Sequence, residues 1–177
     1  MPERTIVVDK LKLEYEGLFD WKELFKLISE WFREKTYDWK EKVSHEHVKK
    51  EGKYIEIILE PWKALTDYVQ SEIKVRIIID DMKTVEVEKK GAKIKLNQGK
   101  ITMLFDGYLT TDWEARWEGK PSYFLLRTIF DRFIYKREIH KYKKQVVEEV
   151  NQLMNEIKSF LNLYKFEYAI TAPEELP

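Results

Sequence analysis

The chain contains no cysteine, and this absence removes several classes of site at once. Disulfide bonds, thiolate metal sites and cysteine nucleophiles are all excluded. Glycine is also sparse, at 6 of 177 residues, and no glycine-rich phosphate loop is present. No apolar run approaches the roughly 18 residues that a membrane-spanning helix needs. Since the first residues also lack an apolar leader core, we expect a cytoplasmic protein.

The chain also lacks an excess of either charge. Lys and Arg number 32, as do Asp and Glu, so no net field attracts nucleic acid or an anionic membrane. The basic run at residues 136–144 could contact a phosphate backbone or an acidic partner. However, Glu148 and Glu149 follow it, and Lys144 and Glu148 are spaced to pair on a helix, which favours a solvated face. Nucleic-acid binding is therefore not expected.

Charged and aromatic side chains are what the sequence has in quantity. Charged residues make up 36% of the chain and aromatic residues 14%, whereas Asn, Gln and Ser are few. This bias resembles proteins from hot environments, in which ion-pair networks replace thermolabile polar residues. The apolar share of 44% and the length of 177 residues suit one globular domain, alone or with an appendage.

Alternation of apolar and polar residues predicts strands over most of the first two thirds of the chain. The predicted strands cover residues 5–15, 39–48, 54–60, 67–80, 84–88, 94–96 and 101–117, with turns at residues 17, 51–52, 80–81, 91 and 97–99. After the first strand, Asp20 as N-cap and Glu23 three residues later predict a helix over 21–35 with an aromatic-rich buried face. In the last strand, Gly107 predicts a bend or a bulge.

The last third of the chain predicts one long helix. From Pro121 to about Tyr164, no glycine or internal proline interrupts apolar residues at helical spacing. The first half of this helix covers the sheet. The second half is expected to have no sheet beneath it, because a strand of about 12 residues reaches only about 40 Å. We expect a kink or a departure from the body around residues 136–144, and an extended segment with a loose acidic end over 165–177.

Together these elements predict an α+β fold. Single-sided alternation with short turns indicates a strongly bent antiparallel sheet of about six or seven strands, which grips the C-terminal helix with its dry face. We divide the chain into a domain formed by residues 1–135 and the first half of the helix, a helix extension at 136–164 that is either packed or protruding, and a tail at 165–177.

The order of strand 5–15, helix 21–35, strands 39–117 and C-terminal helix resembles the helix-grip fold of START-like proteins (SRPBCC), which include polyketide cyclases and lipid-transfer proteins. The likeness is topological, covers most of the chain and rests on no short motif. The chain departs from the family pattern in having one clear helix after the first strand and a longer last helix. The resemblance implies a cavity for a hydrophobic ligand between the sheet and the C-terminal helix, although members also serve as enzymes or protein-binding modules.

We therefore expect non-catalytic binding of a hydrophobic small molecule or lipid, without a cofactor. The alternative is that the aromatic residues involved fill a solid core. The residues predicted to line the cavity are Trp39, Glu41, Trp62, Tyr68, Met103, Phe105, Trp113, Trp117, Phe130 and Phe133.

Polar chemistry is most expected on the strand at 39–48. If Trp39 points inward, Glu41, His45 and His47 follow it, because alternate residues of a strand share one face. Two histidines spaced in this way lie about 7 Å apart, a separation that zinc sites use. A third ligand is needed, and Glu41 is one available candidate. The alternative is a solvated edge strand without a metal, and we assign no metal site.

A second function hypothesis rests on an apolar stripe in the later half of the long helix. If this half protrudes, the stripe is an exposed patch for a homodimer or another protein partner. We find no catalytic constellation, so an enzymatic activity of the same fold has no support from the sequence. The stripe residues are Tyr142, Val146, Val150, Leu153, Ile157 and Phe160.

Overall fold

The computed structural model describes residues 2–48, 52–89, 92–113 and 136–169. The predicted helix over residues 121–135 lies outside these ranges. The described elements are β1 (Glu3–Phe19), α1 (Trp21–Glu34), β2 (Glu41–Val48), β3 (Lys53–Leu59), β4 (Trp62–Ala64), β5 (Val69–Lys89), β6 (Ala92–Thr111) and α3 (Lys136–Ala169).

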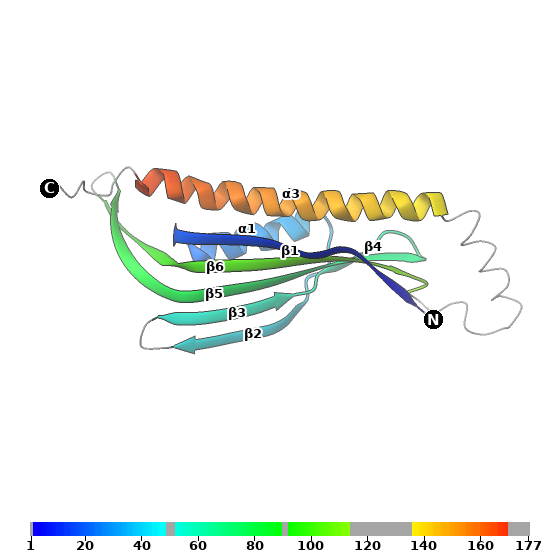
Figure 1. Cartoon of the computed structure of the whole chain (residues 1–177), viewed down its shortest axis with the longest axis horizontal. Helices are drawn as coiled ribbons and strands as arrows, with labels where there is room; N and C mark the ends of the chain where they lie inside the picture. The colour runs from blue at the N-terminus through cyan, green and yellow to red at the C-terminus, as the bar shows by residue number, and fades with distance from the viewer. Residues whose placement is uncertain (1, 49–51, 90–91, 114–135, 170–177) are drawn as a thin grey trace, which may run out of the picture.

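The strands form one antiparallel sheet in the order β1-β6-β5-β3-β2, with the short β4 paired to β5. The sheet bends along its length, and α3 runs along one of its faces with α1 beside it (Figure 1). α3 contacts β1, β6 and β5, and α1 contacts α3. This helix-grip-like arrangement confirms the predicted α+β class with an antiparallel sheet and a C-terminal helix.

β5 and β6 are longer than the sequence pattern predicts. The predicted turn at residues 80–81 is wrong, because β5 continues through it with a register shift between Asp80 and Lys83. Such a bulge takes up extra residues without ending the strand. The predicted turn at residues 97–99 is also wrong, because β6 passes through it. A Cβ on Gly99 would lie 2.9 Å from the Asp80 carbonyl oxygen, so glycine fits opposite the bulge.

The N-terminal cap of α1 is the one that the sequence predicts. The Asp20 carboxylate accepts hydrogen bonds from the backbone N–H groups of Lys22 and Glu23, at 2.9 and 3.1 Å. These bonds satisfy two of the donors that every helix start leaves open. The Glu23 side chain accepts a bond from the Tyr164 hydroxyl of α3 at 3.1 Å, so it connects the two helices.

The C-terminal end of α1 is a Schellman motif. Thr36 takes the left-handed conformation with φ 60°, and the Tyr37 N–H donates to the Phe32 carbonyl at 2.9 Å. The hydrophobic contact of the motif is the edge-on packing of the Tyr37 and Phe32 rings, whose centroids lie 5.4 Å apart. The position of Tyr37 is therefore fixed relative to α1.

α3 lies on the sheet, and the prediction that its second half has no sheet beneath it is wrong. Its 34 residues span about 51 Å, whereas the 21 residues of β5 span about 69 Å. The error follows from the two predicted turns, which shortened the strands. The helix also continues to Ala169, so the predicted extended segment after residue 165 is helical over these residues.

Gly107 on β6 allows α3 to approach the sheet closely. A Cβ at this position would lie 2.8 Å from a methyl carbon of Val146 on α3 and 3.3 Å from Val8 on β1. The sequence predicted a bend or bulge here. The register of β1 against β6 does shift on either side of Val8, the partner of Gly107. The close helix contact gives glycine a second reason to occupy this position.

Candidate functional site

The residues predicted to line a cavity lie in different environments. Met103 and Phe105 are fully buried, whereas Trp39 is 40% exposed and Glu41 is exposed. A second group, which is half-buried near the β4–β5 connection and the end of β6, comprises Trp62, Tyr68 and Trp113. The remaining candidates lie outside the described residues: Trp117, Phe130 and Phe133. The described candidates therefore do not converge on one cavity.

The contact between α3 and the sheet is solid where the structure describes it. A side chain beside a cavity large enough for a water molecule would have accessible surface there. Fully buried residues from both sides of this contact have none: Ile73, Ile77, Met103, Phe105, Val146, Val150, Leu153 and Ile157. These side chains therefore pack against one another at the density of an ordinary core, and leave no space for a ligand among them.

The histidines of β2 do not face the interior. His45 lies opposite Glu56 and His47 opposite Tyr54, and both histidines are exposed. The register shifts between Glu41 and Val43, which takes Glu41 off the histidine face. The condition for an inward polar face of Glu41, His45 and His47 is therefore not met, and β2 is the solvated edge strand of the alternative interpretation. Within the described ranges, no cluster of three or more His, Asp or Glu side chains is arranged to hold a metal ion.

The apolar stripe predicted as an interface belongs to the core of the same chain. Val146, Val150, Leu153 and Ile157 are fully buried, and the half-buried Tyr142 and Phe160 pack against the core. The sheet beneath α3 accounts for this stripe. The surface that α3 offers to other molecules therefore lies outside the buried part of this stripe, and of the stripe residues the half-buried Phe160 borders it.

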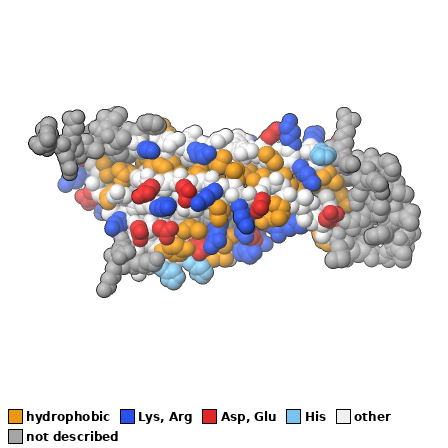
Figure 2. Space-filling view, viewed as in Figure 1, with side chains coloured by type: hydrophobic (Ala, Val, Ile, Leu, Met, Phe, Trp, Pro, Cys, Tyr) orange, Lys and Arg blue, Asp and Glu red, His pale blue; other side chains and the backbone are white. Residues whose placement is uncertain are grey.

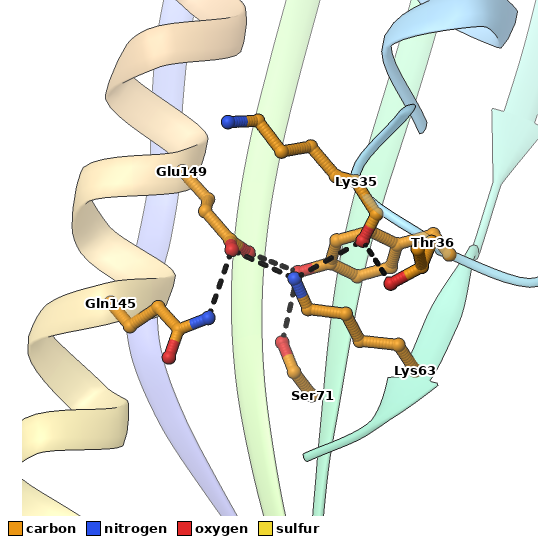
Figure 3. A network of polar contacts seen from close by, with 7 residues as sticks. Lys35, Thr36, Lys63, Ser71, Gln145 and Glu149 are labelled. Atoms are coloured by element: carbon orange, nitrogen blue, oxygen red, sulfur yellow. Dashed lines mark hydrogen bonds and ion pairs between the residues drawn. The ribbon is translucent and has the colours of Figure 1, made fainter. Parts of the chain in front are cut away.

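A buried polar cluster joins α1, β4, β5 and α3 (Figure 3). Glu149 of α3 is its centre. The Glu149 carboxylate accepts hydrogen bonds from Lys63 Nζ at 2.7 Å, from the Tyr37 hydroxyl at 2.7 Å and from Gln145 Nε2 at 3.0 Å. The Tyr37 hydroxyl also lies 3.1 Å from Ser71 Oγ, and Lys63 Nζ lies 4.4 Å from the centre of the Tyr37 ring.

The protonation states of this cluster follow from its partners. Burial raises the pKa of the Tyr37 phenol far above its ordinary value, and the Glu149 charge raises it further, so the hydroxyl keeps its proton. Burial alone would raise the pKa of Glu149. The hydrogen bonds from Lys63, Tyr37 and Gln145, together with the Lys63 charge, lower that pKa below its ordinary value. Because these three donors hold the Glu149 carboxylate ionised, the cluster is better suited to joining helices and strands than to transferring a proton.

A shallow, largely open groove lies between α1 and α3. It has a volume of about 710 Å³. Its apolar lining comes from Leu27 of α1 and from Phe160 and Leu163 of α3. Leu163 is 64% exposed, one of the few large apolar side chains that the described surface leaves open. A second, smaller pocket shares Leu27 and Phe160 and extends the groove to Trp31. One exposed leucine beside two half-buried apolar side chains, with a polar border, makes this groove a candidate binding site.

The border of this groove is acidic. Its described charged lining residues are one lysine, Lys26, and several glutamates: Glu23, Glu30, Glu34, Glu148 and Glu156. Some of this charge is balanced locally, since Glu30 lies 3.8 Å from Arg33 and 3.9 Å from Lys26. The molecular face in Figure 2 differs, because there Lys and Arg side chains lie among Asp and Glu. The groove is therefore a local acidic site on a chain whose formal net charge is zero.

Between the acidic positions, the α3 side of the groove carries uncharged polar side chains. Asn151, Gln152, Asn155 and Ser159 line it. The whole chain has 4 Asn and 4 Gln, and this strip holds 2 of the Asn residues and 1 of the Gln residues. Burying neutral polar groups costs less than burying charges, which suits a surface that another molecule covers. These rare residue types recur at helical spacing on the outward face of α3. This recurrence is the signal in the sequence that points to the groove.

Hydrogen bonds connect the two helices at both ends of the groove. Tyr37, just beyond the end of α1, bonds to Glu149 of α3 at 2.7 Å, and Glu23 near the start of α1 accepts from Tyr164 at 3.1 Å. The helices are therefore antiparallel. The two attachment points on α3 are 15 residues apart in sequence, which corresponds to about 22 Å along a helix. These two contacts within the chain therefore join the helices at both ends of the groove.

Comparisons of the chain with protein-family models, with curated proteins and with solved structures gave no match. The resemblance to START-like proteins therefore stays a prediction. In the part of the chain that the structure describes, no helix is both long and apolar enough to cross a membrane.

Proposed function

We propose that this protein is a protein-interaction module, and that the groove between α1 and α3 binds an amphipathic helix with basic flanks from another protein. The observation that carries this proposal is the open apolar lining at Leu27, Phe160 and Leu163 between two acidic borders. An apolar stripe on the partner helix would cover these side chains. Lysines or arginines on its flanks would meet the glutamates.

The dimensions of the groove support a helical occupant. The length between its two attachment points corresponds to about 22 Å, or about four turns of an α-helix. A helix in such a groove presents apolar side chains at steps of three and four residues to the lining. The amides of Asn151, Gln152 and Asn155 can exchange hydrogen bonds with polar side chains of the incoming helix.

A hydrophobic ligand between the sheet and α3, which the START-like resemblance implies, has no comparable support among the described residues. Met103 and Phe105 have no accessible surface on the side where such a ligand would lie. The α1–α3 groove, by contrast, is open and already formed. The acidic border also argues against a second copy of this chain in the same groove, because its glutamates would then meet each other.

The test is the affinity of a labelled peptide for the whole chain. The probe is a peptide of about 18 residues with leucine at helical spacing and lysine at the other positions. We expect it to bind the wild-type protein in fluorescence anisotropy. We expect Leu163→Glu to weaken the binding by about tenfold or more, because burial of a leucine contributes about 2 kcal/mol.

The matched control is Ile6→Glu on β1. Ile6 is 58% exposed, close to the 64% of Leu163, and it lies opposite Tyr108 away from the groove. This variant should bind the peptide like the wild type, and a peptide with glutamate in place of lysine should bind weakly. Equal losses from Ile6→Glu and Leu163→Glu would contradict the proposal. So would a concentration-dependent dimer of this chain that Leu163→Glu dissociates and that excludes the peptide.

A further inference from the structure

The cluster around Glu149 lies at the end of the groove where α1 stops. Tyr37 cannot move independently of α1, because its N–H is bonded to Phe32 and its ring packs on the Phe32 ring. Its hydroxyl reaches Glu149 on α3 at 2.7 Å. This oxygen atom joins the end of α1 directly to the middle of α3. Lys63 Nζ adds a second and longer link, because it donates to the Lys35 carbonyl at 3.4 Å and to Glu149 at 2.7 Å.

We infer that the Tyr37–Glu149 hydrogen bond is a positioning contact for the groove, and that it sets the width of the groove and thereby the affinity for the partner helix. This inference rests on the proposed function. Lys63 and Gln145 hold the Glu149 carboxylate in place from the other sides, at 2.7 and 3.0 Å. Because the carboxylate cannot shift easily, loss of the Tyr37 hydroxyl frees the end of α1 rather than moving α3.

Apolar contacts alone would not fix this end of α1 so closely. Trp31 and Phe32 are buried near the end of the helix, but contacts between apolar surfaces have little directional preference. The hydrogen bond to an ionised group, by contrast, is short and directional. The Glu23–Tyr164 bond at the other end of the groove lies on the exposed surface, where water competes for it.

The test compares Tyr37→Phe with Ser71→Ala. Tyr37→Phe removes both hydrogen bonds of the hydroxyl, to Glu149 and to Ser71, whereas Ser71→Ala removes the bond to Ser71 alone, and Ser71 on β5 does not join α1 to α3. We expect Tyr37→Phe to weaken binding of the leucine–lysine peptide by about fivefold. We expect Ser71→Ala to leave the affinity within about twofold of wild type. Circular dichroism establishes that both variants are folded at the temperature of the titration.

A second readout does not depend on the peptide. Because the chain has no cysteine, Arg33→Cys on α1 and Lys144→Cys on α3, both exposed, give two unique spin-label sites. We expect a broader distance distribution between the labels after Tyr37→Phe and an unchanged one after Ser71→Ala. An unchanged distribution for Tyr37→Phe, or an equal broadening for both variants, overturns the inference. Failure of the wild type to bind the peptide contradicts the proposed function alone.

Discussion

At the scale of single residues, the described structure depends on a few long-range polar contacts that connect otherwise separate segments. Lys63 and Tyr37 both contact Glu149, although they are 86 and 112 positions away from it in the sequence. Lys63 and Glu149 form a buried ion pair in which other donors also satisfy the carboxylate. Removing one partner of such a pair leaves the other charge buried and uncompensated, which costs more than the pair itself contributes.

The pH dependence of stability should report this pair. The folded-state pKa of Glu149 is lowered, so its stabilising contribution is present above the ordinary glutamate pKa of 4.5 and is lost as pH falls through the lowered value. We expect Glu149→Gln to lower the free energy of unfolding by about 3 kcal/mol at pH 7. The difference from wild type should shrink on acidification below pH 4.5. Urea unfolding at a series of pH values measures it.

The neighbouring Glu148 provides the control for that experiment. Its side chain is exposed and lies 3.7 Å from Lys144, so Glu148→Gln should change the unfolding free energy by less than about 1 kcal/mol at any pH. A difference between wild type and Glu149→Gln that stays constant with pH would show that folding does not lower the pKa of Glu149.

At the scale of elements, local signals were sufficient for some parts of the fold and insufficient for others. The sequence predicts α1 well, because the Asp20 cap and the apolar stripe both lie within the helix and its flanks. It does not predict the full length of β5 and β6. Asp80-Asp81 and residues 97–99 have turn-like composition, and only the paired strand shows that a bulge keeps them in the sheet.

The candidate site was harder to predict than the elements. The stripe on α3 was recognised, but whether it meets a sheet or a partner depends on the lengths of the strands. The Glu149 cluster could not be predicted, because residues 37, 63 and 149 carry no shared motif and only the tertiary fold brings them together. The groove, in contrast, had a sequence signal in the rare amides at Asn151, Gln152 and Asn155.

The close packing of α3 on the sheet leads to a prediction about the stability of the fold. We expect Gly107→Ala to lower the free energy of unfolding by about 2 kcal/mol, because its Cβ would lie 2.8 Å from Val146 and force the helix away. Chemical denaturation measures this loss. The double variant Gly107→Ala, Val146→Ala should recover part of it, since the shorter side chain makes room. Unchanged stability of Gly107→Ala would mean that α3 is not packed closely against β6.

At the scale of the whole molecule, one face of the sheet is covered by two helices, and the groove between these helices is the surface that we propose for a partner. The interior beneath α3 is filled by side chains of the same chain. The two helices are held together at both ends of the groove. Because the groove is already formed, this chain loses little conformational entropy when a partner binds. Such a groove suits a partner whose binding segment is flexible before it binds.

The most direct test of this account is a methyl NMR titration of the whole protein with the leucine–lysine peptide. We predict that the methyl signals of Leu27 and Leu163 shift in proportion to the peptide bound, because these side chains line the groove. The methyl signals of Ile6 on β1 and Val48 on β2, which are exposed elsewhere, should stay in place. Shifts at Ile6 or Val48 without shifts at Leu27 and Leu163 would contradict the claim that the α1–α3 groove is the binding surface.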